Sequence, residues 1–100
     1  MNKFKITIAP EAIEDIHQAV FWYNEQLEGL GQRFSTQVKT SINSLKTNPQ
    51  RHSIRYNEVR CVLIKKFPFL VHYTIHESQN IVEIFAVFHT SRNPKIWEKR

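Results

Sequence analysis

The stretch that decides the fold runs from residue 10 to residue 49 and reads PEAIEDIHQAVFWYNEQLEGLGQRFSTQVKTSINSLKTNP. Its apolar residues return every three or four positions, as on one face of an amphipathic helix. The pattern is broken at Gly29-Leu30-Gly31 and stops at Asn48-Pro49. We therefore predict two helices, over about residues 10–28 and 31–47, that form an antiparallel hairpin. The two apolar stripes are Ile13, Ile16, Val20, Tyr23 and Leu27, then Phe34, Val38, Ile42 and Leu45.

Outside this hairpin the sequence is typical of strands, with apolar residues in alternation or in short runs. After Pro49, a short extended piece and a turn at Asn57-Glu58 lead into three segments joined by short connections, which predicts an antiparallel meander. The last segment is the most apolar, so we place it inside the sheet. The expected strands cover residues 3–8, 59–65, 70–76 and 81–88, with the extended piece at 54–56.

The order β-α-α-β-β-β predicts an α+β fold of two layers, with the helical hairpin packed on a mostly antiparallel four-stranded sheet. The chain has 100 residues, 41% of them hydrophobic, which fits one domain over residues 1–100. Its single cysteine, Cys61, excludes a disulfide framework and a cysteine-based zinc site. No apolar run is long enough to span a membrane and the start does not resemble a signal peptide, so we expect a cytoplasmic protein.

The positive charge lies in the second half of the chain. Residues 1–50 carry five Lys or Arg and five acids, whereas residues 51–100 carry nine and four, which accounts for the whole net charge of +5. A basic half of this kind suits nucleic acid or an acidic protein partner. The alternative is an ordinary solvated basic surface.

Several motifs that carry chemistry are missing from the sequence. It has no phosphate-binding glycine loop, no Gly-x-Ser-x-Gly and no His, Cys, Asp or Glu cluster with the spacing of metal ligands. We therefore expect no cofactor and no metal, which disfavours a metalloenzyme or a nucleotide-driven enzyme.

Arg60 and His89 are the two candidate residues for chemistry in the predicted sheet. Arg60 shares a strand face with apolar neighbours and needs an anionic partner, either a ligand or, in an internal salt bridge, Glu83. His89 ends the last strand with the parity of Phe85 and Val87, where an imidazole can transfer a proton or bind phosphate. The alternative for His89 is a strand-end histidine that hydrogen-bonds to the backbone.

Other notable side chains are given structural roles. We expect His72 to be a surface or packing residue and Cys61 to be a small buried hydrophobe. Phe21 and Trp22 lie beside the helical stripe, where they widen the core face or, alternatively, dock a partner. Trp97 is expected to fold back onto the domain and hide its ring.

Two longer pieces of the second half form a recognisable pattern, Phe67-Pro68-Phe69-Leu70-Val71-His72-Tyr73 and Ile84-Phe85-Ala86-Val87-Phe88-His89-Thr90-Ser91-Arg92-Asn93-Pro94. Pro10-Glu11-Ala12 at the first helix, Arg60 and the tail from Trp97 to Arg100 agree with it. In their order and spacing these pieces resemble the RelE/ParE toxin superfamily of bacterial type II toxin–antitoxin systems, and the resemblance covers essentially the whole chain. The resemblance implies a growth-inhibiting toxin that is neutralised by a cognate acidic antitoxin.

Two activities are implied by this resemblance, because one branch of the superfamily cleaves mRNA on the ribosome without a metal and the other poisons DNA gyrase. In a nuclease, Arg60 would bind the phosphate and His89 would be the general acid or base. The ribonuclease hypothesis leads, since an arginine and a histidine on adjacent strands form a usable pair. The gyrase inhibitor is the alternative, and an inactive, binding-only toxin fold is a third. Residues expected to bind RNA or a partner are Arg51, Arg55, Lys65, Lys66 and Arg92.

Overall fold

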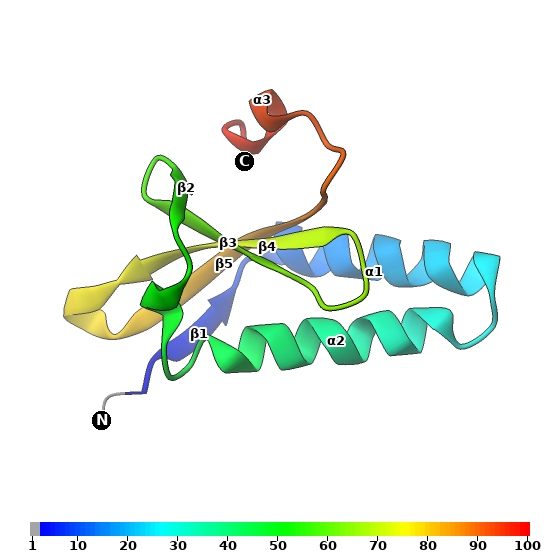
Figure 1. Cartoon of the computed structure of the whole chain (residues 1–100), viewed down its shortest axis with the longest axis horizontal. Coiled ribbons are helices and arrows are strands. Elements are labelled where there is room, and N and C mark those ends of the chain that lie inside the picture. The colour runs from blue at the N-terminus through cyan, green and yellow to red at the C-terminus, as the bar shows by residue number, and fades with distance from the viewer. Residues whose placement is uncertain (1–2) are drawn as a thin grey trace.

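A five-stranded sheet forms the middle of the molecule in the computed structural model, which describes residues 3–100. Its strand order is β1-β5-β4-β3-β2, with β1 parallel to β5 and the other neighbours antiparallel (Figure 1). The strands are β1 (Lys5–Ile8), β2 (Ile54–Tyr56), β3 (Val59–Leu63), β4 (Phe69–His76) and β5 (Ile81–His89). The helices are α1 (Pro10–Gln26), α2 (Leu30–Ser44) and α3 (Pro94–Trp97), and single 3-10 turns are η1 (Pro49–Arg51) and η2 (Glu77–Gln79).

The predicted α+β class is confirmed, but the sheet has five strands instead of four. The extra strand is the extended piece β2, which pairs with β3 across the predicted turn. Asn57 and Glu58 in this turn have φ values of 39° and 67°, the left-handed backbone that tight hairpins require. As predicted, β5 lies inside the sheet, between β1 and β4.

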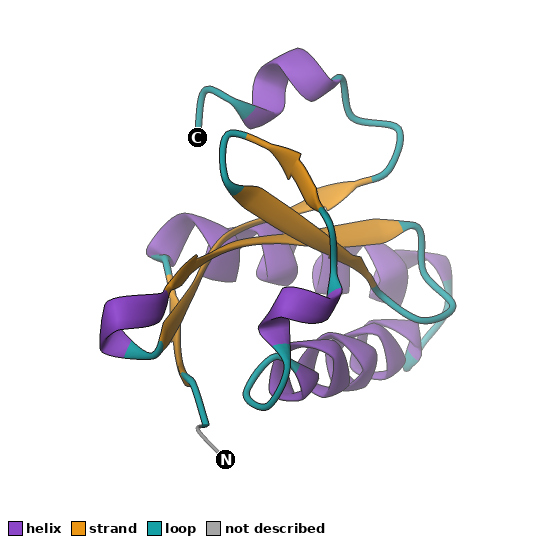
Figure 2. Cartoon of the chain, turned by 60° about the vertical axis from the view of Figure 1, so that its left-hand side comes forward, coloured by secondary structure: helices purple, strands orange, loops and turns teal. Residues whose placement is uncertain are grey.

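The helices α1 and α2 form the predicted antiparallel hairpin and cover one face of the sheet (Figure 2). Gly29 makes the sharp turn with a φ of 86°. Gly31 lets the helices approach closely, because a Cβ there would lie 2.4 Å from the carbonyl oxygen of Val20. The Gly31 amide also donates to Asn24 Oδ1 over 2.8 Å, which fixes the start of α2.

The face of α1 that meets the sheet is rotated from the predicted stripe. Ala12, Ala19 and Tyr23 are its buried residues, whereas Ile13 is 41% exposed and Leu27 is 58% exposed. Small alanines let α1 lie close to the sheet, and this moves the larger Ile13, Ile16 and Val20 toward the groove beside α2. Together with Tyr23, the rings of Phe34, Phe67 and Phe69 form an aromatic cluster with centroids 5.0–6.1 Å apart.

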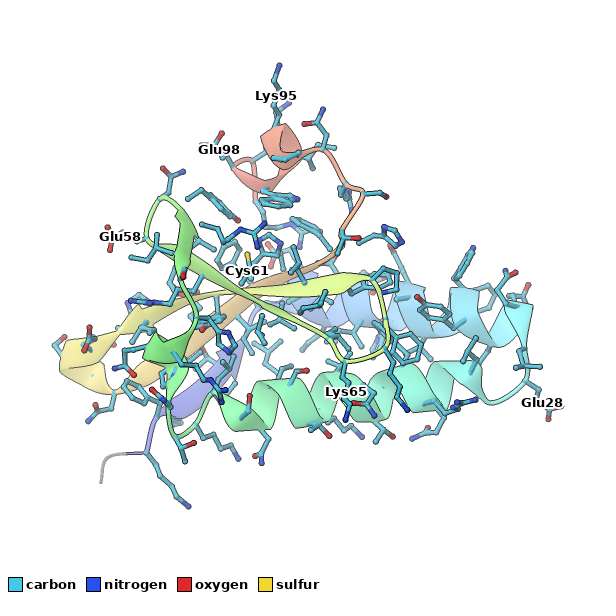
Figure 3. All side chains as sticks on the ribbon, in the orientation of Figure 1. Glu28, Glu58, Cys61, Lys65, Lys95 and Glu98 are labelled. Carbon is cyan, nitrogen blue, oxygen red and sulfur yellow. The ribbon has the colours of Figure 1, made fainter. Side chains whose placement is uncertain are left out.

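The opposite face of the sheet is covered by α3, and Tyr56 of β2 packs against the same cluster (Figures 1 and 3). Trp97 packs there at 8% exposure, which confirms that its ring folds back onto the domain. Cys61 is buried in the same cluster, as predicted. In residues 3–100, no helix has both the length and the apolar character needed to cross a membrane.

A bulge in β5 changes which side chains share a face. His72 pairs with Ala86 but the next residue of β4, Tyr73, pairs with Ile84, so Phe85 has no partner. Phe85 therefore packs on the α3 side while Val87 packs under the helices. The predicted shared parity of His89 with both residues is wrong, and His89 follows Val87 onto the helical side.

Candidate functional site

His89 lies at the end of β5, and its ring orientation is fixed by the turn that follows. Its Nδ1 accepts a hydrogen bond from the Ser91 backbone N–H over 3.1 Å and lies 2.8 Å from Ser91 Oγ. An N–H group can only donate, so in the neutral ring the proton is assigned to Nε2. The ring packs edge-on against Phe69 with centroids 5.2 Å apart. His89 therefore presents an N–H donor, and not a free lone pair, to its surroundings.

Two adjoining hollows meet at His89, and we call them together the His89 groove. One, of about 180 Å³, extends toward Asp15 and Arg92, and the other, of about 420 Å³, extends toward Trp22. Both share Ala19, Phe69 and His89 as walls. The wider one is mostly apolar and is lined by Ala19, Trp22, Tyr23, Pro68, Phe69 and His89.

Phe21 and Trp22 do not widen the core face, contrary to the favoured expectation. Their exposed fractions are 69% and 56%, because the close approach of Ala12 and Ala19 to the sheet turns them outward. Trp22 forms one wall of the His89 groove. An exposed tryptophan beside a hollow is typical of a surface that docks a partner.

Asp15 of α1 lines one end of the His89 groove and forms an ion pair with Arg100. The Arg100 guanidinium donates to both Asp15 oxygens, over 2.8 and 3.1 Å, and also to the carbonyl of Phe85 over 3.3 Å. Asp15 accepts from the Val87 backbone N–H as well, over 3.0 Å. Hydrogen bonding to Asp15 raises the pKa of Arg100. The pairing of β1 with β5 ends at Ile8. Beyond that point, Asp15 and Arg100 make the hydrogen bonds to the Val87 N–H and the Phe85 carbonyl that a neighbouring strand would otherwise make.

Sequence reasoning missed this pair, because 85 residues separate Asp15 from Arg100 and no motif links them. The only signal was an acid near the start of a helix and a basic tail. Neither indicates that the two segments meet at a sheet edge.

Arg60 is held by the backbone of the segment that precedes β2. Its Nη1 donates to the carbonyl of His52 over 2.6 Å and to that of Gln50 over 3.1 Å. The alternative salt bridge to Glu83 does not form, since Glu83 lies 2.9 Å from Nε2 of His76. Burial, followed by the charges of Arg51 and Arg60, lowers the pKa of His52. Arg60 therefore fastens η1 to the sheet.

Arg60 and His89 do not lie on adjacent strands, contrary to the prediction. Arg60 is on β3 and His89 is on β5, with β4 between them. Arg60 pairs with Tyr73, and Tyr73 pairs with Ile84, five residues before His89. Ordinary strand geometry then separates them by about 16 Å along the strands and about 10 Å across them.

The remaining predicted binding residues are all exposed and lie in separate places. Arg51 and Arg55 lie near Arg60, in η1 and β2. Lys65 and Lys66 are on the loop between β3 and β4 (Lys65 is labelled in Figure 3), and Arg92 lines the His89 groove. The cations therefore do not form one strip.

A buried polar cluster lies under α3 and was not predicted as such. His72 is fully buried, with Nδ1 3.0 Å from the Tyr56 hydroxyl and 3.4 Å from Cys61 Sγ. Burial lowers the pKa of His72 to about 4, and burial raises the pKa of the Cys61 thiol to about 11. A thiol with a raised pKa is a poor nucleophile, so this cluster supports packing and not catalysis.

Comparison with known proteins gives a consistent assignment. The family model of the ParE toxin of type II toxin–antitoxin systems (parDE) matches residues 6–94. No curated protein matches the chain. A chain of the chromosomal ParDE system from P. aeruginosa superposes with a TM-score of 0.78 at 10% identity, over 89% of this chain and 98% of that one.

RelE-type structures share the same fold. A chain of the E. coli RelBE complex has a TM-score of 0.68 at 12% identity, with 89% of this chain and 99% of that chain covered. A chain of the RelE–RelB complex from Pyrococcus horikoshii has a TM-score of 0.62 at 8% identity, and the superposition covers 91% of this chain and 99% of that chain. Since the family model spans nearly the whole chain, the protein belongs to the ParE toxin family of type II toxin–antitoxin systems, within the RelE/ParE superfamily.

Proposed function

We propose that this toxin arrests growth by binding its target without cleaving RNA, and that the target is DNA gyrase. The observation that carries the proposal is the separation of Arg60 from His89 by an intervening strand. The match to the ParE toxin model supports it as well, because the ParE-like branch is the one expected to act on gyrase.

Metal-free RNA cleavage sets a strict geometric requirement. The 2′-OH attacks the adjacent phosphate, so the cation that stabilises the phosphorane and the group that moves the proton must both reach one phosphate. Arg60 is too far from His89 for this, and its guanidinium is already bonded to two carbonyls. With Nδ1 accepting from Ser91, neutral His89 offers a donor and no free lone pair for a general base.

The His89 groove supports binding. Interfaces depend on a few central aromatic and arginine side chains in or beside hollows. Here the exposed ring of Trp22 forms one wall of the groove, its sequence neighbour Phe21 is also exposed, and Arg92 lies at the other end of the groove. We assign these residues to the contact with gyrase.

A cognate acidic antitoxin is the second proposed partner. The net charge of +5 favours a negatively charged protein, and the structural relatives from E. coli and P. horikoshii are toxin–antitoxin complexes. We expect the interaction to weaken with salt where its ion pairs are exposed.

The deciding experiment measures supercoiling by purified gyrase and mRNA cleavage on programmed ribosomes, with the same toxin preparation in both. We expect inhibition of gyrase and no mRNA cleavage. Trp22→Ala should raise the inhibitory concentration about 30-fold, as expected when an interface loses a ~2 kcal/mol contact. Leu63→Ala is the matched control, because Leu63 is 60% exposed but lies outside the groove.

The same experiment can also overturn the proposal. Ribosomal mRNA cleavage that His89→Ala reduces by about 10²–10⁴-fold, with gyrase unaffected, would replace this proposal with the ribonuclease.

A further inference from the structure

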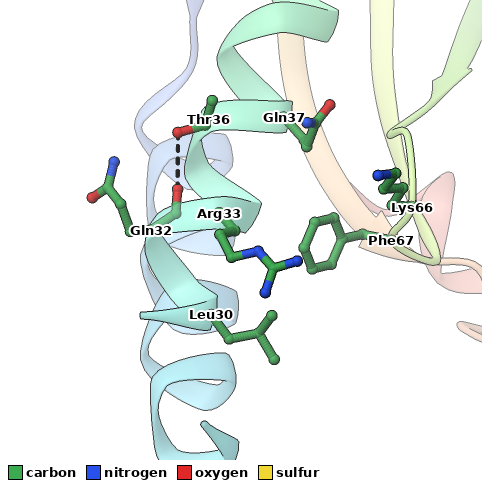
Figure 4. Close-up of a pocket in the computed structure, with 7 residues that line it drawn as sticks. All are labelled: Leu30, Gln32, Arg33, Thr36, Gln37, Lys66 and Phe67. Atoms are coloured by element: carbon green, nitrogen blue, oxygen red, sulfur yellow. Dashed lines mark hydrogen bonds between the residues drawn. The ribbon is translucent and has the colours of Figure 1, made fainter. Parts of the chain in front are cut away.

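Another hollow, separate from the His89 groove, lies between α2 and the loop that joins β3 to β4. It measures about 340 Å³, and Figure 4 shows its walls. The Arg33 side chain reaches from α2 toward the ring of Phe67, and Lys66 reaches in from the loop beside Gln37. We call this hollow the Arg33–Lys66 pocket; its other lining residues are Leu30, Gln32 and Thr36.

Both cations in this pocket lack an acidic partner. The ion pairs within residues 3–100 join His76 to Glu83 and Arg100 to Asp15, and neither includes Arg33 or Lys66. The lining contains no acid. The surrounding sequence is unusually poor in acids, since residues 29–76 contain eight Lys or Arg and a single acid, Glu58. Two uncompensated cations over an apolar floor are therefore suited to an anionic group attached to an apolar one.

The pocket is held rigidly in place by its own loop. Lys66 has a φ of 71°, and the Ile64 amide donates to the Phe69 carbonyl over 2.9 Å, which closes the turn. The Phe67 ring packs against Tyr23 and Phe34 with centroids 5.1 and 5.2 Å away. The loop therefore presents Lys66 opposite Arg33 before any ligand arrives, and this reduces the entropic cost of binding.

We propose that the Arg33–Lys66 pocket binds a carboxylate side chain of an acidic peptide segment, with a neighbouring apolar side chain on Leu30 and Phe67. The inference deepens the proposed function, since it rests on the existence of a neutralising acidic protein partner, and it names where that partner is recognised.

A peptide fits the pocket better than RNA does. Single-stranded RNA is bound by exposed aromatic faces on which bases stack, together with a groove of cations that follows the backbone. Phe67 is half-buried in the aromatic cluster, so the pocket offers one partly covered ring, which an aliphatic side chain can contact, and only two cations, fewer than a stacked strand needs. The amides of Gln32 and Gln37 add hydrogen-bonding groups that suit a peptide backbone.

The test titrates the full chain with each of two synthetic peptides, Ac-Leu-Glu-Glu-Leu-NH₂ and Ac-Leu-Gln-Gln-Leu-NH₂, and monitors binding by NMR. We expect the Glu peptide to shift the amide signals of Arg33, Thr36, Lys66 and Phe67, and the Gln peptide to bind at least fivefold more weakly. The double variant Arg33→Gln/Lys66→Gln should weaken binding of the Glu peptide by about tenfold, as two exposed ion pairs allow. Raising the salt concentration from 50 to 300 mM should weaken binding of the Glu peptide to the parent, because salt screens these ion pairs.

The matched control is Lys46→Gln/Lys65→Gln, which removes the same charge from exposed lysines outside the pocket. It should leave the affinity within twofold of the parent. Equal losses in both double variants, equal binding of the two peptides, or no shifts at the pocket would overturn the inference. Preferential binding of a 12-nucleotide oligo(U) RNA at the same signals would overturn it in favour of nucleic acid.

The gyrase assay separates this inference from the proposed function. If Arg33→Gln/Lys66→Gln binds the peptide weakly but inhibits gyrase like the parent, both stand. If the parent fails to inhibit gyrase but binds the Glu peptide at the pocket, only the proposed target fails.

Discussion

His72 lies among the rings of Tyr56, Phe88 and Trp97, on the sheet face that α3 covers. Histidine is the common choice for acid–base chemistry, so its presence suggests a catalytic role, but burial here disfavours the charged form of the ring. Burial lowers its pKa from 6.5 to about 4. Its role is therefore structural and depends on pH.

We expect His72 to destabilise the fold in acid. The unfolded chain takes up this proton as the pH falls through 6.5, whereas the folded chain resists it down to about 4, so the contribution is intact above pH 6.5 and declines below. Between pH 7 and pH 5 the loss should be about 2 kcal/mol in the free energy of unfolding. Urea denaturation at pH 7 and at pH 5 measures this difference in the free energy of unfolding.

His72→Phe provides the control for this prediction. It should lose less stability than the parent between pH 7 and pH 5, while His52, whose pKa burial also lowers, contributes equally to both proteins. The same pH dependence in both proteins would show that another group is responsible.

Arg60 is the second residue whose role the structure changes. Because its guanidinium donates to two carbonyls, Arg60→Ala should lower the free energy of unfolding by about 2 kcal/mol. Arg51→Ala removes an equal charge from an exposed neighbour and should change stability by less than about 0.5 kcal/mol. Thermal denaturation of the two variants tests this directly, and equal melting temperatures would contradict it.

At the scale of elements, most of the fold could be predicted from the sequence. Apolar spacing located both helices and Pro49 marked the change to strands, because these signals are local. The pairing of β2, the bulge at Phe85 and the rotated face of α1 could not be predicted, since each depends on contacts between distant segments. The candidate site also depends on such contacts, because the strand order and the strand register together separate Arg60 from His89.

The helical hairpin depends on one close approach, at Gly31. We expect Gly31→Ala to be severely destabilising, because its Cβ would press on the backbone oxygen of Val20 at 2.4 Å and displace the Asn24 side chain at 2.7 Å. Gly29→Ala meets no atom within 4 Å and costs only the strain of a positive φ, about 1 kcal/mol. Thermal denaturation followed by circular dichroism should give a lower melting temperature for Gly31→Ala than for Gly29→Ala. The reverse order would mean that the turn, and not the contact, limits stability.

At the scale of the whole molecule, the Asp15–Arg100 pair ties the C-terminal segment to the first helix. Arg100→Gln should free α3 and the open edge of β5, so hydrogen exchange should accelerate at residues 94–100 and at the Val87 amide. Exchange in α2 should not change, and this provides an internal control. Uniform acceleration throughout the chain would indicate global destabilisation instead.

The parallel pairing of β1 with β5 has a consequence for the chain while it is being made. β1 has no partner until Ile81–Ile84 have been synthesised, so the helical hairpin emerges from the ribosome before the interior of the sheet exists to cover it. Folding of this topology waits for its most distant contact. His89 is at the end of the same strand, and its groove needs both Trp22 and Phe69. A ribosome can therefore translate most of this message before the product has its His89 groove.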